Sequence, residues 1–152
     1  MIKHIKCNIF DSGADIICHQ VNCMGIMGSG IAKQVRQRYP WVYGEYKEFC
    51  EHFKPHELLG LCLTVHINET RMIANIFGQE RYGYDGKRYT NYDAVSNALL
   101  ELAKFYPGRT IAIPYMMSCA RGGGDWNVIY GLIEDIFSDY TGNILICEYQ
   151  EA

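Results

Sequence analysis

The stretch that decides the fold is HQVNCMGIMGSGIA, residues 19–32. It starts inside an apolar segment, residues 15–21, which has the composition of a buried parallel strand. A polar residue, Asn22, ends this segment, three glycines follow, and an amphipathic helical pattern begins near Ser29. Glycine lets a ligand approach the backbone closely, and a helix start offers free N–H groups and a positive dipole end. The stretch therefore predicts an anion site, most often one for a phosphate.

The glycine spacing alone leaves three interpretations open. The interval from Gly25 to Gly30 fits a Walker-type loop, but Ile31 and Ala32 stand where that loop needs Lys and Ser/Thr. A dinucleotide fingerprint reads G-x-G-x-x-G after a first strand, whereas this loop reads G-x-x-G-x-G after the second one. The third interpretation is a turn whose glycines serve geometry alone.

A second glycine-rich loop favours the phosphate interpretation. It follows a predicted buried strand, residues 110–113, and precedes a predicted helix with Asp125 as its cap. Three consecutive glycines are entropically costly to order, so we expect this loop to hold a ligand. Arg121 is either a charge-assisted ligand contact or a solvated loop arginine. The loop consists of Ser118, Cys119, Ala120, Arg121, Gly122, Gly123 and Gly124.

Alternating strands and helices predict a three-layer α/β/α sandwich on a mixed, mostly parallel sheet. The pattern predicts strands at residues 2–10, 15–21, 61–67, 71–77, 110–113 and 143–149, and helices at 29–38, 42–52, 91–105 and 125–139. The third and fourth strands are expected to form a hairpin. Ligands of such sheets bind beyond the carboxyl ends of the strands, an edge that gathers residues 22–30, 77–84 and 118–124.

Length and composition limit the functional classes. With 152 residues, 49% of them hydrophobic, we expect one domain over residues 1–152, acting as a monomer. The net charge of −3 argues against a general nucleic-acid binder. No signal-type or membrane-spanning segment is visible, so we expect a cytoplasmic protein without membrane contact.

The seven cysteines show neither paired nor zinc-type spacing. We therefore expect reduced thiols, no metal and no cofactor. Cys23 and Cys119 lie in the glycine loops, but a nucleophilic role there requires a lowered thiol pKa.

These features together resemble the macrodomain family over nearly the whole chain. The similarity is greatest to the branch of ADP-ribose-1''-phosphate phosphatases and small ADP-ribosyl-ester hydrolases. The matching stretches are Lys6-Cys7-Asn8-Ile9, His19-x-x-Asn22-Cys23-x-Gly25-x-x-Gly28-x-Gly30-Ile31-Ala32, Arg38-Tyr39-Pro40 and Leu58-Leu59-Gly60.

The resemblance implies that ADP-ribose, a small-molecule ligand, binds with its diphosphate between the two glycine loops. Asn8 and Ile9 would lie beside the adenine, with Asn8 in place of the aspartate that many macrodomains carry. We expect weaker adenine selection, since the amide accepts without charge assistance. Asn22 would contact the distal ribose. The residues expected to line the phosphates are Gly28, Ser29, Gly30 and Ile31.

His19 corresponds to a histidine implicated in catalysis in the phosphatase branch, so we expect His19 and Asn22 to carry the chemistry. A histidine can serve as general base, general acid or phosphoryl acceptor, and the alternative is a buried core histidine. A lysine-adduct mechanism, used by a related hydrolase branch, is disfavoured because residues 77–81 contain no lysine. Asp125 suits a helix cap better than a catalytic acid.

The sequence thus predicts an ADP-ribose-binding macrodomain that acts as an ADP-ribose-1''-phosphate phosphatase. Two alternatives stay open: a hydrolase that removes ADP-ribose from protein or nucleic acid, and a non-catalytic ADP-ribose reader. Nucleic acid is expected only as an ADP-ribosylated substrate. Tyr82, Tyr84 and Tyr89 either cover the ligand or pack on their own domain.

Overall fold

The computed structural model describes residues 1–150 and contains a six-stranded sheet in the order β1-β6-β5-β2-β4-β3. All neighbouring strands are parallel except β3 and β4, which form the predicted hairpin. The strands are β1 (Ile2–Lys6), β2 (Ile16–Asn22), β3 (Cys62–His66), β4 (Met72–Gln79), β5 (Thr110–Pro114) and β6 (Asn143–Glu148).

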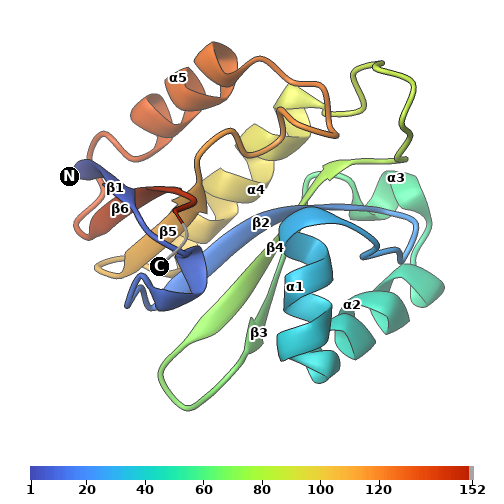
Figure 1. The fold of residues 1–152 in the computed structure, drawn as a ribbon, viewed down its shortest axis with the longest axis horizontal. Coiled ribbons are helices and arrows are strands. Elements are labelled where there is room, and N and C mark those ends of the chain that lie inside the picture. Colours follow the sequence, from blue (N-terminus) through green and yellow to red (C-terminus); the bar gives the residue numbers. More distant parts are fainter. Residues whose placement is uncertain (151–152) are drawn as a thin grey trace.

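Helices cover both faces of the sheet, which confirms the predicted three-layer α/β/α arrangement (Figure 1). Helices α1 and α2 lie on one face, and α4 and α5 lie on the other (Figure 1). The helical segments are η1 (Ile9–Asp11), α1 (Gly30–Arg38), α2 (Pro40–His52), α3 (Pro55–Leu58), α4 (Tyr92–Phe105) and α5 (Trp126–Ile136).

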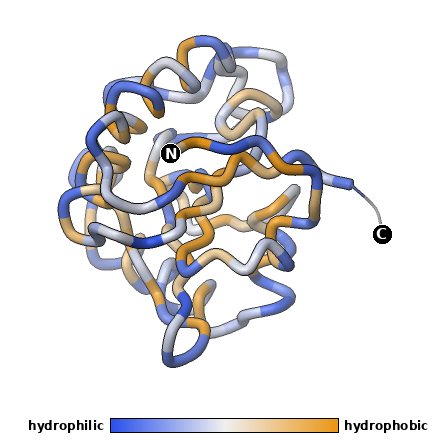
Figure 2. The backbone as a smooth tube through the Cα atoms, turned by 90° about the vertical axis from the view of Figure 1, so that its left-hand side faces the viewer, coloured by the Kyte–Doolittle hydropathy of each residue, from blue (hydrophilic) through white to orange (hydrophobic). Residues whose placement is uncertain are grey.

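Side-chain alternation along β2 divides the core into two layers. Ile17 and Val21 join the apolar cluster under α1 and α2, whereas Ile16 and Cys18 join the cluster under α4 and α5. Because β2 lies inside the sheet and is covered on both faces, all of its residues except the half-buried Gln20 are buried. Figure 2 shows hydrophobic chain segments gathered in the interior, with the two colours alternating along the outer helices.

One predicted strand end was wrong, and one helix was missed. The first strand ends at Lys6 and not at residue 10, because the Asn8 side chain accepts a hydrogen bond from the Phe10 amide and caps η1. The short helix α3 was not predicted, since four residues are too few to show a helical period. No helix among residues 1–150 has the length and apolar character needed to cross a bilayer.

Candidate functional site

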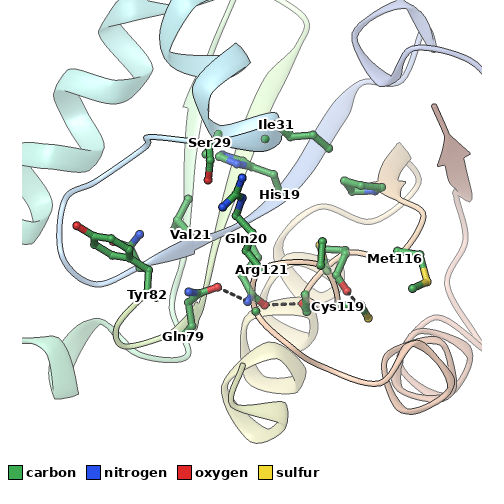
Figure 3. A pocket seen from close by; sticks show the side chains of 18 of the residues that line it. His19, Gln20, Val21, Ser29, Ile31, Gln79, Tyr82, Met116, Cys119 and Arg121 are labelled. Carbon is green, nitrogen blue, oxygen red and sulfur yellow. Dashed lines mark hydrogen bonds between the residues drawn. The ribbon is translucent and has the colours of Figure 1, made fainter. Parts of the chain in front are cut away.

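A cavity of about 330 Å³ lies at the carboxyl ends of the central strands. Its walls come from the end of β2, the first glycine loop with the start of α1, the segment after β4, and the loop after β5 (Figure 3). Of the predicted site residues, those in the lining are His19, Asn22, Gly28, Ser29, Gly30, Ile31, Ser118, Cys119, Ala120, Arg121 and Gly122. Outside the lining lie Asn8, Ile9, Gly123 and Gly124. The two glycine loops therefore face one cavity.

The start of α1 is an open helix N-terminus. Ser29 occupies the N-cap position in an extended conformation, but its side chain makes no capping hydrogen bond. No acidic side chain lies in the first turn of α1. The first backbone N–H groups of a helix have no partner within it, so those of α1 are available to an anion in the cavity.

Gly30 has the space and the backbone conformation that an anion needs to approach the start of α1. Its φ of +60° lies in the left-handed region, where most other residues are strained. A methyl group added there would meet no atom within 4 Å, which shows that the loop backbone borders open space.

Asn22 shapes the first loop with its own side chain. The register of β2 against β4 shifts between Val21 and Asn22, which ends the strand's regular alternation. The Asn22 Oδ1 accepts hydrogen bonds from the Met24 amide and the Tyr46 hydroxyl, both at 2.9 Å. Its Nδ2 donates to the Ile26 carbonyl oxygen at 2.9 Å. Because most of its hydrogen-bonding capacity is used within the protein, Asn22 is first of all a loop-forming residue. One Nδ2 hydrogen remains for a ligand.

The second loop carries unusual backbone conformations. Met116 and Ser118 have φ values of 64° and 73°, in the left-handed region that non-glycine residues rarely adopt. Such residues cost about 1–3 kcal/mol each and cluster at ligand sites. Both line the cavity. Nothing in the sequence marks them, because neither is a residue type that favours this conformation.

Gln20 holds the second loop in place. Its Oε1 accepts a hydrogen bond from the Ser118 hydroxyl, and its Nε2 donates to Gln79 Oε1 at 2.7 Å (Figure 3). The same Nε2 donates to Thr90 Oγ1 at 2.9 Å. Thr90 in turn donates to the Ser118 carbonyl oxygen at 2.8 Å. One side chain of β2 thereby joins three other segments around the cavity. Sequence reasoning missed this role, although a glutamine between His19 and Val21 in an apolar strand is the signal that could have found it.

The three consecutive glycines of the second loop pack against residues 87–90. A Cβ on Gly122 would collide with Thr90 Oγ1, and one on Gly123 would lie 2.7 Å from the Lys87 carbonyl oxygen. On Gly124 it would lie 2.8 Å from the Ser118 carbonyl oxygen. Close chain packing therefore accounts for these glycines without a ligand, which the argument from ordering entropy did not foresee.

The start of α5 is closed to ligands by its own cap. The Asp125 side chain accepts a hydrogen bond from the Asn127 amide at 2.9 Å, as the sequence predicted. The cavity therefore faces one open helix start, that of α1, and the backbone of the second loop.

His19 is one of the residues that line the cavity, and it is only 2% exposed. Its Nε2 is 2.7 Å from Oδ1 of Asn75, whereas its Nδ1 has no hydrogen-bond partner. Burial lowers the pKa of His19 from 6.5 to about 4, and the Asn75 hydrogen bond opposes this only in part. The imidazole is therefore neutral near pH 7.

The charges around the cavity favour an anion. Among the described residues that line it, Arg121 is the one with a full charge, and none carries a carboxylate. The Arg121 guanidinium lies 4.7 Å from the centre of the Tyr84 ring, which joins the second loop to the segment after β4. Tyr82 packs edge-on against Tyr84. Tyr89 lies outside the lining, and its hydroxyl donates to Asp85.

The cysteines of the two loops are not activated. Burial raises the pKa of Cys23 to about 12 and that of Cys119 to about 11, so both thiols are protonated at neutral pH. Cys119 donates a hydrogen bond to the Met117 carbonyl oxygen. All seven cysteines are free in the structure.

Comparison with known sequences gives partial matches to enzymes. No protein-family model matches the chain. An ADP-ribose 1''-phosphate phosphatase of Aspergillus oryzae is 44% identical over 55 residues, 35% of this chain. A DNA ADP-ribosyl glycohydrolase of Mycobacterium tuberculosis is 24% identical over 129 residues, 83% of this chain. The matches span 27% of the length of the phosphatase and 36% of that of the glycohydrolase.

Comparison with solved structures covers the whole fold. The macrodomain of Mycobacterium tuberculosis DarG superposes with a TM-score of 0.79 at 21% identity, covering 100% of this chain and 99% of that one. Thermosipho africanus DarTG in complex with ADP-ribose gives a TM-score of 0.76 at 18% identity, covering 93% of this chain and 39% of that one. The observed architecture is shared with both structures.

Proposed function

We propose that this chain, which has the macrodomain fold, binds ADP-ribose in the cavity and removes the phosphate from ADP-ribose 1''-phosphate. The observation that carries the proposal is the pairing of the open α1 start with the strained second loop across one cavity that contains a buried neutral histidine. The similarity to ADP-ribose 1''-phosphate phosphatases and the ADP-ribose complex of a structural neighbour support the choice of ligand.

The diphosphate would lie between the start of α1 and the second loop. On one side, backbone N–H groups from Gly28 to Ile31 would donate to phosphate oxygens. On the other side, the backbone around Ser118 and the Arg121 guanidinium would supply donors and positive charge.

Phosphate removal would depend on positioning and on one proton acceptor. In the reaction a water oxygen forms a bond to phosphorus while the bond from phosphorus to the ribose 1''-oxygen breaks. His19 would accept a proton from the water, and the resulting imidazolium would give a proton to the departing oxygen, which ends as a hydroxyl group. Backbone donors around the transferred group would stabilise its charge. The products are ADP-ribose and inorganic phosphate.

A second candidate function is the removal of ADP-ribose from a modified nucleic acid. The match to the DNA ADP-ribosyl glycohydrolase favours it, because that match covers most of this chain. No lysine is found among the described residues that line the cavity, which argues against a lysine-adduct route. A third candidate, a reader without activity, would keep the phosphate contacts and lack turnover.

One experiment separates these functions. Purified protein is incubated with ADP-ribose 1''-phosphate and, separately, with ADP-ribosylated DNA, while phosphate and ADP-ribose release are followed. We expect phosphate release that His19→Ala reduces at least tenfold, with ADP-ribose affinity in calorimetry changed less than threefold. Release of ADP-ribose from the DNA alone would favour the second candidate, and binding without either release would favour the reader.

A further inference from the structure

Asn75 is a buried polar side chain in the middle of β4. It is fully buried and lies opposite His19 in the register between β2 and β4. Its neighbours two residues away along the strand, Ile73 and Phe77, are also fully buried and belong to the apolar cluster under α1 and α2. An amide in such surroundings is unfavourable unless its hydrogen bonds are made. The Asn75 side chain therefore needs partners, and the structure supplies two.

Those two partners fix the orientation of the Asn75 amide. Its Nδ2 donates a hydrogen bond to the Leu63 carbonyl oxygen of β3 at 3.0 Å. Its Oδ1 then faces His19, 2.7 Å from Nε2. A carbonyl oxygen can only accept, so the hydrogen of the neutral imidazole must be on Nε2.

The same arrangement determines what the other ring nitrogen does. With the hydrogen on Nε2, Nδ1 holds a lone pair and can only accept. Nδ1 is buried and has no partner among the described residues. Buried polar atoms of this kind are rare, and a ligand or a catalytic role is among the standard explanations for one. A histidine that served packing alone would be expected to use both nitrogens.

We infer that Asn75 is a positioning residue for His19, holding the ring hydrogen on Nε2 so that Nδ1 is kept as a proton acceptor. The inference deepens the proposed phosphatase function and rests on it. The Leu63 backbone carbonyl in the neighbouring strand fixes the orientation of the Asn75 amide. That orientation determines the tautomer of His19, and the tautomer determines which ring nitrogen can accept a proton. Without Asn75 the hydrogen is free to move to Nδ1, where it would remove the acceptor.

The tautomer can be observed directly by nitrogen-15 NMR of the full chain at pH 7, without substrate. We expect the wild type to show His19 with Nε2 protonated and Nδ1 unprotonated. In Asn75→Leu we expect a measurable population with Nδ1 protonated. The matched control is Thr64→Val in β3, the strand next to that of Asn75. This change removes the side-chain hydrogen bond between Thr64 and the Tyr106 hydroxyl and does not touch His19. A wild-type ring protonated on Nδ1 would overturn the inference.

Kinetics supply the second readout. For Asn75→Leu we expect kcat for phosphate release to fall at least tenfold with KM changed less than threefold, and Thr64→Val to match the wild type. Equal losses in the two variants would overturn the inference. If Asn75→Leu does not fold, Asn75→Asp tests the same contact. The introduced carboxylate keeps an acceptor at Nε2 of His19 and favours the imidazolium form. The acid limb of the pH–rate profile must therefore move to higher pH. An unmoved profile would contradict a positioning role.

The two proposals fail separately. Absence of phosphate release in the wild type would overturn the proposed activity and leave the NMR result standing. Phosphate release with normal kcat in Asn75→Leu would leave the activity standing and overturn the role of Asn75.

Discussion

The Ser118 hydroxyl donates a hydrogen bond to Oε1 of Gln20, and this contact ties the second glycine loop to the central strand β2. Ser118 is held there in a left-handed backbone conformation, with φ at 73°. The loop thus keeps its strained shape because a buried polar network, with Gln20 at its centre, stabilises it.

Replacing Gln20 should therefore disturb both stability and binding. Gln20→Met leaves Ser118, Gln79 and Thr90 without this partner, and we expect a loss of about 2–3 kcal/mol in the free energy of unfolding. We also expect ADP-ribose to bind about tenfold more weakly, since the second loop is no longer fixed. Urea unfolding and calorimetry measure the two effects. The control is Gln37→Met on the exposed face of α1. Wild-type affinity in Gln20→Met would contradict the role given to the network.

Gly123 approaches residues 87–90 closely. Gly123 and Gly13 have similar positive φ values, +69° and +75°, but a Cβ on Gly13 would meet nothing within 4 Å. Gly13→Ala should therefore cost about 1 kcal/mol from the backbone conformation alone. Gly123→Ala should cost about 1–3 kcal/mol more, because its methyl group overlaps the Lys87 carbonyl oxygen. Thermal unfolding of both variants measures the difference in stability. Equal losses of stability would show that Gly123 is not tightly packed against residues 87–90.

Burial of His19 predicts a pH dependence of stability. Its pKa is about 4 in the folded protein and 6.5 in the reference state, so between these values the unfolded chain binds more protons than the folded one. The stabilisation is complete above pH 6.5 and is lost as the pH falls toward 4. From pH 7 to pH 5 the His19 contribution should drop by about 2 kcal/mol.

The measurement is urea unfolding of the wild type and of His19→Leu at pH 7 and pH 5. The difference between the two proteins isolates His19 from the other titrating groups. A wild type that loses no more stability than His19→Leu over this range would mean that His19 titrates normally in the fold.

The fold and the cavity were only partly predictable from the sequence. The two glycine loops, the order of strands and helices along the chain, and the Asp125 cap follow from local signals, and the structure confirms the hairpin of β3 and β4. Local patterns of glycine, capping residues and apolar period carry this information.

The roles of Gln20 and Asn75 were not predicted, because each depends on partners far away in sequence. Gln20 meets Ser118 and Thr90, and Asn75 meets His19 and Leu63, across strands whose register the sequence does not state. The left-handed conformation of Ser118 is likewise a consequence of tertiary contacts and not of residue type. Asn8 shows the opposite case: its capping of η1 is local, but the apolar period of residues 2–10 concealed it.

Arg121 supplies the positive charge at the cavity. Arg121→Ala should weaken ADP-ribose binding about five- to tenfold, and the loss should shrink at high salt because the side chain is exposed to solvent. Arg121→Lys keeps the charge but not the planar stacking on Tyr84, so its loss should be intermediate. Arg88→Ala is the matched control, because Arg88 stacks on Tyr92 in the same way outside the cavity. Equal affinity for ADP-ribose in the wild type and the three variants would mean that the anion binds elsewhere.

The central claim, that the open start of α1 holds the phosphates, is tested most directly by calorimetry of ADP-ribose with Ser29→Asp. An aspartate at the N-cap accepts hydrogen bonds from the first turn and normally stabilises a helix, by about 0.5–1 kcal/mol, so the fold should not suffer. Its carboxylate would occupy the site of the phosphates. We predict one-to-one binding in the wild type, nearly unchanged affinity in Ser29→Ala, which loses no capping hydrogen bond, and at least tenfold weaker binding in Ser29→Asp. Unaltered affinity in Ser29→Asp, or no binding by the wild type, would contradict the account.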